Sequence, residues 1–234
     1  MGRRVAAPED RTAMDVDISP LIENWQFILT GLGFTVSLSG LSIVLGVGIG
    51  LVCGVMRTYG GSLLDTAIGL YVDLLRSIPV LAILVWTYFA FPLVIGESLT
   101  PFSGGVLALG VHLGAYVTEV IRAGLTSIRP GQMRAALALG MSPLQAIRTI
   151  ILPQALIRML PPLGSLIVIA VKDSAIASVI AVPELLRQSQ VLAGKTFRPF
   201  EIYTAAMLIY FLICYPTART IDQIYRRFAP LGAS

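Results

Sequence analysis

The sequence predicts an all-α membrane protein with about five transmembrane helices. Of its 234 residues, 56% are hydrophobic and only 13% are charged, which is far more apolar than a soluble domain. Residues 27–56 contain no charged side chain, and at ~1.5 Å per residue this run is longer than the ~30 Å core of a bilayer requires. These observations exclude a water-soluble protein, and the length fits a single domain.

Five apolar runs are the candidate spans. They cover residues 27–56, 63–95, 102–121, 147–182 and 202–218. Gly46 and Gly50 in the first run form a small-xxx-small pair, a pattern that lets membrane helices pack closely. Pro153, Pro161 and Pro162 predict an interruption or bend of the fourth span, because proline removes a backbone donor and kinks a helix.

Arginine residues outside the spans orient the chain, because cytoplasmic loops near span ends are enriched in Lys and Arg. The connection between the third and fourth spans and the C-terminal end are rich in arginine, at positions Arg122, Arg129, Arg134, Arg148, Arg219, Arg226 and Arg227. We therefore expect both segments in the cytoplasm and the N-terminus outside. Residues 183–201 argue the other way, since they would lie outside although they hold three basic residues.

The connection between the third and fourth spans also predicts a short helix. Residues 133–139 are mostly strong helix formers, with Pro130-Gly131 before them and Gly140 and Ser142-Pro143 after them. This polar segment is too long for a simple turn. It either transmits motion from a soluble partner to the spans or lies on the lipid surface as an amphipathic anchor.

Several motifs at characteristic spacing point to one family. They are Glu119-Val-Ile-Arg-Ala-Gly-Leu-Thr-Ser-Ile-Arg-Pro-Gly-Gln, Arg134-Ala-Ala-Leu-Ala-Leu-Gly, Ile151-Leu-Pro-Gln-Ala, Leu75-Arg76-Ser77-Ile78-Pro79, Ala115-Tyr116, Pro161-Pro162, Lys172-Asp173-Ser174 and Glu184-Leu185. Together they resemble the permeases of ABC importers for polar amino acids of the histidine, glutamine, arginine and glutamate type. The resemblance implies a type I importer permease, with an extension at 1–13, one transmembrane domain at 14–227 and a tail at 228–234.

The resemblance implies that the chain is the permease subunit of an ATP-driven importer in the bacterial cytoplasmic (inner) membrane. The substrate would be a polar amino acid or a related small zwitterion such as ectoine. The implied partners are two copies of an ATP-binding subunit, a second permease that is identical or homologous, an extracytoplasmic substrate-binding protein and membrane lipid. The implied coupling residues are Gly131, Gln132, Arg134, Ala135, Ala136 and Gly140. Arg134 stands where relatives usually have Glu, and His112 stands where they commonly have Asn.

Polar residues at membrane depth are the candidate substrate pathway, because such residues are costly there unless they face protein or water. They are Lys172, Asp173, Ser174, Arg76, Glu119, His112 and Tyr116. Other roles remain open for several of them. Lys172 and Asp173 could form an ion pair with each other or across subunits, Arg76 could pair with Asp73, and His112 and Tyr116 could simply pack. Glu119 follows His112 by seven residues, so both project from nearly one helical face.

Other classes of protein are disfavoured by what the sequence lacks. There is no Walker A motif and no cluster of metal ligands, so ATP and Mg are expected on the partner subunit and no cofactor in this chain. The single histidine has no GxSxG motif to pair with, which argues against an intramembrane protease. Five unequal spans without internal duplication argue against a secondary carrier, and scattered basic residues argue against nucleic-acid binding. We therefore expect that the chain is not an enzyme.

Overall fold

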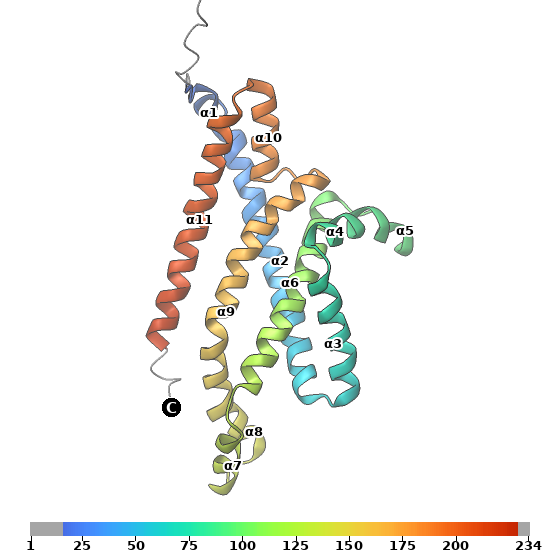
Figure 1. The fold of residues 1–234 in the computed structure, drawn as a ribbon, viewed down its shortest axis with the longest axis vertical. Coiled ribbons are helices and arrows are strands. Elements are labelled where there is room, and N and C mark those ends of the chain that lie inside the picture. Colours follow the sequence, from blue (N-terminus) through green and yellow to red (C-terminus); the bar gives the residue numbers. More distant parts are fainter. Residues whose placement is uncertain (1–15, 229–234) are drawn as a thin grey trace, which may run out of the picture.

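The computed structural model describes residues 16–228, and all regular structure within this range is helical. The helices are α1 (Ser19–Glu23), α2 (Trp25–Tyr59), α3 (Ser62–Ser77), α4 (Val80–Val85), α5 (Phe91–Ile95), α6 (Pro101–Thr126), α7 (Pro130–Ala138), α8 (Pro143–Ala146), α9 (Leu152–Asp173), α10 (Leu185–Thr196) and α11 (Pro199–Phe228). Figure 1 shows the long helices along one axis, with α1 at one end and α7 and α8 at the other. The predicted extension at 1–13 and all of the predicted tail except Phe228 lie outside the described residues.

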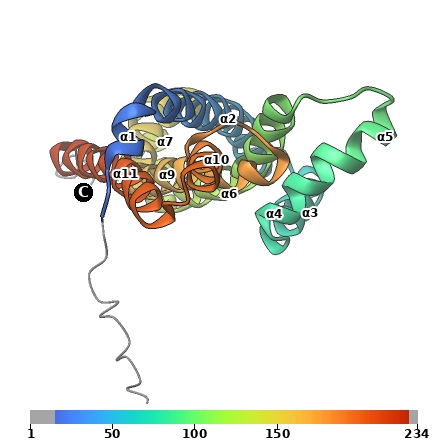
Figure 2. The same cartoon turned by 90° about the horizontal axis from the view of Figure 1, so that it is seen from above.

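Within residues 16–228, four helical stretches are long and apolar enough to cross a bilayer. They are Trp25–Tyr59, Pro101–Thr126, Pro143–Ile180 and Pro199–Phe228. The predicted span over residues 63–95 is different, because Ser62–Ser77 and Val80–Ile95 meet at an angle of 104°. The expected count of about five holds when this bent pair is taken as one crossing. Figure 2 shows α3, α4 and α5 on one side of the bundle and α11 on the other.

The bend in the second span has a local cause in Ile78 and Pro79. Proline disfavours helical backbone in the residue that precedes it, and Ile78 is extended, with φ −96° and ψ 135°. Pro79 then starts the next helix, where its missing N–H breaks no hydrogen bond. A π-helical segment, Trp86–Ala90, follows α4 and leads into α5. The apolar run is therefore continuous in sequence although the helix is broken.

The expected interruption of the fourth span is not found. Helical residues run without a break from Pro143 to Ile180, and Pro161 and Pro162 lie inside α9. A π-helical segment, Ile147–Ile151, lies just before Pro153. Proline has no N–H for the carbonyl four residues earlier, and the wider π turn shifts the backbone pairing by one residue at this point.

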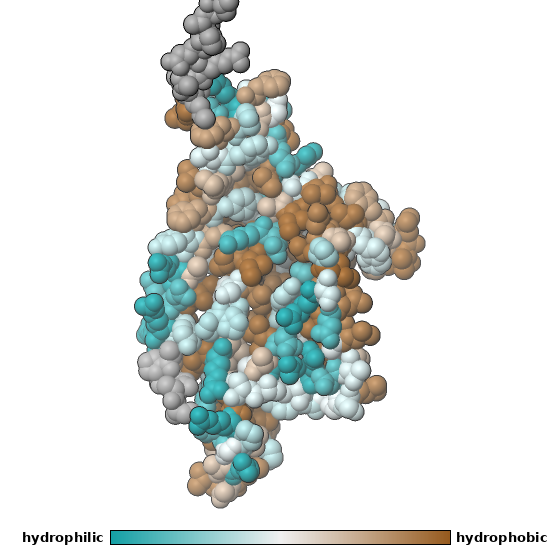
Figure 3. Space-filling view, viewed as in Figure 1, coloured by the Kyte–Doolittle hydropathy of each residue, from teal (hydrophilic) through white to brown (hydrophobic). Residues whose placement is uncertain are grey.

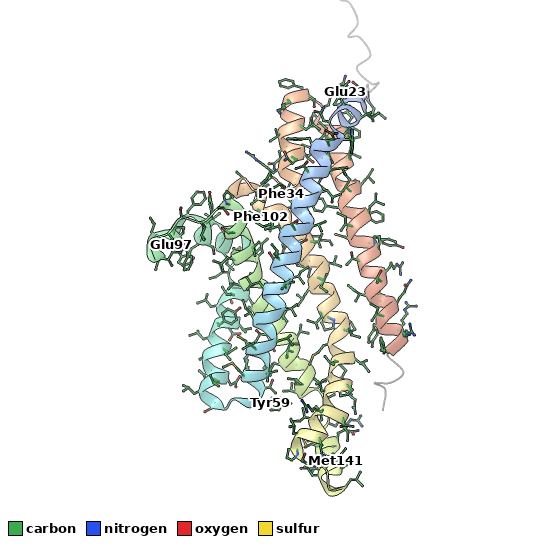
Figure 4. All side chains as sticks on the ribbon, turned by 180° about the vertical axis from the view of Figure 1, so that it is seen from behind. Glu23, Phe34, Tyr59, Glu97, Phe102 and Met141 are labelled. Carbon is green, nitrogen blue, oxygen red and sulfur yellow. The ribbon has the colours of Figure 1, made fainter. Side chains whose placement is uncertain are left out.

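Helices α2 and α6 pack with almost no space between their backbones. A Cβ atom added to Gly50 would lie 2.3 Å from Cγ1 of Val117, and one added to Gly46 would lie 2.9 Å from Cβ of Leu113. Two glycines of α6 receive side chains of α2 in the same way. The close contact predicted for the small-xxx-small pair is therefore confirmed. Towards the α1 end, Phe34 of α2 lies edge-on against Phe102 of α6, with ring centroids 6.0 Å apart (Figure 4).

A buried carboxylate joins three helices near the α1 end. Glu184 is fully buried, and its Oε1 accepts a hydrogen bond from the backbone N–H of Arg187 at 2.7 Å. Its Oε2 accepts one from the Tyr210 hydroxyl of α11 at 2.9 Å. Thr35 of α2 accepts the N–H of Leu185 at 3.0 Å. Burial raises the pKa of the Glu184 carboxyl, while these hydrogen bonds oppose the rise. Because a buried carboxyl needs partners, the contacts anchor α10 to α2 and α11.

An ion-pair network holds α2, α3 and α6 together near the opposite end. Arg57 Nη1 lies 2.9 Å from Glu119 Oε2, and Arg57 Nε lies 3.0 Å from Asp65 Oδ1. Arg122 Nε donates to Glu119 Oε2 at 3.1 Å. Arg57 and Glu119 are both largely shielded from solvent, whereas the Asp65 side chain is 56% exposed. The network fixes the hairpin between α2 and α3 against α6.

The glycine contact predicts opposite effects of one substitution at two neighbouring sites. Gly50→Ala should destabilise the protein by about 1–3 kcal/mol, because the methyl group overpacks the contact with Val117. Gly48→Ala is the matched control, since a Cβ there meets nothing within 4 Å, and Ala is intrinsically better than Gly in a helix. Thermal unfolding of the purified protein in detergent measures both. Equal melting temperatures for the two variants would contradict the packing.

The ion-pair network predicts that the two ion pairs of Arg57 have different coupling energies. A double-mutant cycle with Arg57→Gln and Glu119→Gln should give a coupling energy of about 1–2 kcal/mol, because this pair is partly buried. The matched cycle with Arg57→Gln and Asp65→Asn should give about 0.5 kcal/mol or less, because Asp65 is exposed. Unfolding in mixed detergent micelles provides both values. A larger coupling energy for the Arg57–Asp65 pair would refute the expectation that the more buried Arg57–Glu119 pair is the stronger one.

Candidate functional site

A cavity of about 510 Å³ opens between the end of α3, α6 and α9. Four of the seven predicted pathway residues line it, namely Arg76, His112, Tyr116 and Asp173. The extended turn at Ile78 and Pro79 forms part of the wall, and leucine and isoleucine side chains form much of the rest. The size is typical of small-molecule sites, which are mostly apolar with a few convergent polar groups. The bend of the second span thus provides one side of the cavity.

Three polar side chains form a row along the cavity wall. The Arg76 guanidinium carbon lies 5.2 Å from the centroid of the Tyr116 ring, within range of a cation–π contact. The His112 ring meets the Tyr116 ring edge-on, with centroids 5.1 Å apart. His112 and Tyr116 share a face of α6 because they are four residues apart. Within residues 16–228, Arg76 forms no ion pair with Asp73, so that alternative role is not realised.

His112 is buried, with 9% of its surface exposed, and its Nδ1 has no hydrogen-bond partner among the described residues. Buried polar atoms in folded proteins nearly always have a partner, and an unsatisfied one calls for an explanation. The packing role considered for His112 accounts for its ring, which contacts Tyr116. It does not account for the missing partner of Nδ1, an atom buried within the protein.

Lys172 and Asp173 lie in different environments although they are neighbours. Asp173 lines the cavity. Lys172 is exposed and lines a separate hollow of about 270 Å³ with Asp222 of α11. Successive residues of a helix point about 100° apart, and no ion pair between the two is found in the described part of the chain. Ser174 is buried, and its hydroxyl donates to the Val171 carbonyl at 2.7 Å instead of lining the cavity.

Glu119 does not join the cavity residues. Its carboxylate is held by Arg57 and Arg122 in the network described above, and it does not line the cavity with His112. The sequence reasoning missed Arg57 as the partner of Glu119, and Asp65 as the second partner of Arg57. The sequence does contain a signal for the pairing of Arg57 with Asp65. The two opposite charges lie on either side of the Gly60-Gly61 turn, and they come together when α2 and α3 form a hairpin.

The predicted short helix at 133–139 is confirmed as α7, Pro130–Ala138. Ala136 is buried, whereas Arg134 is exposed. Gly140 has φ +81°, a conformation that favours glycine, and it leads the chain towards α8. Figures 1 and 4 place this hairpin, with Met141 labelled near its tip, at the end of the molecule.

The surface of this hairpin is mixed rather than purely polar. Leu137 and Leu139 are 43% and 83% exposed, and Leu144 on α8 is also exposed. The remaining predicted coupling residues lie on the same hairpin, where Gly131 and Ala135 are exposed and Gln132 is half-buried. Figure 3 shows hydrophilic residues near this end, beside hydrophobic ones, and a second hydrophilic patch over α3 and α6. The hairpin therefore presents both charge and apolar surface outside the bundle.

Within residues 16–228, no group of three or more His, Cys, Asp or Glu side chains could hold a metal ion.

Comparison with known proteins identifies relatives that match most of the chain. Residues 46–230 match the family described as binding-protein-dependent transport system inner membrane component. The glutamine transport system permease protein GlnP of Escherichia coli (strain K12) is 34% identical over 215 residues, which cover 92% of this chain and 98% of that protein. The L-cystine transport system permease protein TcyB of Bacillus subtilis (strain 168) is 31% identical and covers 87% of each chain.

Solved structures agree with these relatives. The crystal structure of an amino acid ABC transporter with histidines matches 92% of this chain and 100% of its own, with a TM-score of 0.84 and 33% identity. An inward-facing MetNI methionine ABC transporter has a TM-score of 0.72 over 88% of this chain and 97% of its own at 21% identity, which shows the shared fold alone. The predicted resemblance is confirmed. The chain belongs to the binding-protein-dependent transport system inner membrane components, and its fold is that of a type I ABC importer permease.

Proposed function

We propose that the chain is the permease subunit of an ATP-driven importer of amino acids. The observation that carries the proposal is the cavity, which brings Arg76 and Asp173 into one lining that also contains His112, Tyr116 and several apolar side chains. An amino acid carries one carboxylate and one ammonium group, so it satisfies both charges. Relatives named for glutamine and cystine transport support this substrate class over a compatible solute such as ectoine.

The cavity residues take separate roles in this proposal. Arg76 binds the substrate carboxylate, because a guanidinium can donate two parallel hydrogen bonds to it. Asp173 binds the ammonium group, and Tyr116 holds Arg76 in place through its ring. Lys172, exposed beside α11, faces the pathway outside this cavity. Ser174 and Glu119 support the helices that position the pathway.

We assign the α7 end to the cytoplasm and the α1 end to the outside of a bacterial inner membrane. The two ends are opposite in Figure 1, and the arginine-rich segments gather at the α7 end. Two copies of an ATP-binding subunit, which hold ATP and Mg, dock on the inner side and hydrolyse ATP. A second permease, identical or homologous, completes the pathway, and a substrate-binding protein delivers the amino acid from outside.

The α7 hairpin is the proposed contact with the ATP-binding subunit. Its exposed Leu137 and Leu139 supply apolar area, and Arg134 supplies charge. A helix that only anchored the chain in lipid would need one continuous apolar face. Because Arg134 replaces the usual Glu of the family, the surface that it meets is expected to be acidic.

The assignment of the cavity as the substrate site predicts that substitutions of Asp173 and Lys172 differ in their effect on substrate binding. Asp173→Asn should weaken binding of radiolabelled glutamine to the purified permease–ATPase complex by at least about tenfold, because losing one partner of a desolvated charge pair costs about 2–5 kcal/mol. Lys172→Met is the matched control at the adjacent position and should bind glutamine within about threefold of wild type. If both Asp173→Asn and Arg76→Met bind like wild type, this cavity is not the substrate site.

The assignment of the α7 hairpin as the docking surface predicts that the charge of Arg134 affects binding of the ATP-binding subunit. Arg134→Glu should reduce co-purification of the ATP-binding subunit by about tenfold or more, because opposing like charges at an interface cost several kcal/mol. Arg134→Gln should give an intermediate loss. Arg227→Glu, the same charge reversal at the end of α11, serves as the control and should leave co-purification unchanged. Wild-type recovery of the complex with Arg134→Glu would place Arg134 outside the interface.

A further inference from the structure

Helix α10 presents a basic face at the end of the molecule that we assign to the outside. Figure 1 places α10 beside α11 at the α1 end. Leu185 and Leu192 of α10 are buried, whereas Arg187 is half-buried and Lys195 is exposed. Arg187 and Lys195 are eight residues apart, so they lie on a common face of the helix. Neither forms an ion pair within residues 16–228.

The two acidic residues of this segment do not offset that charge. Glu184 is fully buried, and Glu201 is only 8% exposed. Glu201 Oε1 accepts the backbone N–H of Asp17 at 3.2 Å and lies 3.5 Å from Nη1 of Arg198. Basic residues beside spans are typical of the cytoplasmic side, so this segment was the exception to the orientation of the chain. Outside the membrane, such a face attracts an acidic surface in solution.

Phe197 ends α10 in a backbone conformation that phenylalanine rarely adopts. Its φ is +55° and its ψ is 28°, in the left-handed region where helices usually end on glycine. Its side chain is 86% exposed, so packing of the ring within the described residues does not offset the strain. A strained residue that the surrounding structure holds in place points to a function. Aromatic side chains are also enriched among the residues that dominate binding at protein interfaces.

Gly194 leaves open space beside these residues. A Cβ atom added there would meet nothing within 4 Å, although glycine is less favourable than alanine inside a helix. The described residues therefore give no packing reason for glycine at this position. A missing side chain on an exposed helical face allows the backbone of another molecule to approach closely.

We propose that this face of α10, with Phe197 at its end, docks the substrate-binding protein. The surface that it fits has an apolar pocket for Phe197 and an acidic rim that meets Arg187 and Lys195. This inference rests on the proposed function, which assigns the α1 end to the outside, and the family is described as binding-protein-dependent. The hydrogen bonds of Glu184 anchor α10 to α11, so the docked protein contacts a rigid part of the bundle.

A lipid surface is the other occupant that the position of α10 suggests. A helix that lies on lipid presents a continuous apolar face. Arg187, Gly194 and Lys195 interrupt any such face on the outside of α10. The charges and the open space therefore favour a protein over lipid.

The probe is the amino-acid-loaded binding protein that stimulates ATP hydrolysis by the purified permease–ATPase complex. Its affinity is measured by half-maximal stimulation in phosphatidylcholine nanodiscs and by direct binding in detergent. Phe197→Gly, Lys195→Glu and Gly194→Trp should each weaken it about tenfold or more, through loss of the anchor, reversal of the charge and filling of the open space. Glu23→Lys, a charge reversal on α1 at the same end (Figure 4), is the control and should not weaken it.

Thermal unfolding separates docking from a structural role of Phe197. Phe197→Gly should melt at or above the wild-type temperature, because glycine adopts the left-handed conformation without strain. A lower melting temperature together with the loss of affinity would show that Phe197 acts on the fold, which overturns the inference.

Three further results contradict the inference in distinguishable ways. Wild-type affinity in Phe197→Gly, Lys195→Glu and Gly194→Trp would place the docking surface elsewhere, while the proposed function stands. A loss of affinity that occurs in nanodiscs but not in detergent would show that α10 meets lipid. If no amino-acid-binding protein stimulates the wild-type complex, the proposed function fails together with this inference.

Discussion

Glycines on α2 bring its backbone against α6, and most other features of the molecule depend on this contact. Side chains of each helix occupy the space left by missing Cβ atoms on the other. In a membrane, where lipid is as apolar as leucine, such close packing is a main source of attraction between helices. Because α2 holds α6 rigidly, the residues on the remaining faces of α6 are held in fixed positions. His112 and Tyr116 face the cavity on one side, and Glu119 meets Arg57 on α2.

The break at Ile78 and Pro79 forms part of the wall of the cavity beside α6. A straight helix over residues 63–95 would place Arg76 in the middle of a span, surrounded by its own neighbours. The turn instead ends α3 at Ser77 and leaves Arg76 beside Tyr116 in the lining of a cavity. Backbone geometry imposed by one proline therefore decides where a guanidinium group meets the cavity.

Two groups of charged residues in the helices differ in how they are paired. Arg57, Glu119 and Arg122 satisfy one another, so they stabilise the helices and offer little to a ligand. Arg76 and Asp173 line the same cavity and form no ion pair within residues 16–228, which agrees with the proposal that they bind a zwitterion. The two departures from the family pattern lie in the two regions to which we assign recognition. His112 lines the cavity, and Arg134 is exposed on the α7 hairpin.

The sequence by itself determined the class of protein, its family, the short α7 helix and the close contact at Gly46 and Gly50. These follow from the cost of placing polar groups in lipid and from local backbone preferences, which depend on residue type and spacing alone. Only the tertiary structure decided that the second span bends, that the fourth passes its prolines unbroken, and that Asp173 but not Lys172 or Glu119 reaches the cavity. Hydropathy averages over a window and carries no direction, whereas the partner of a charged side chain depends on which helices pack together and how each is rotated about its axis.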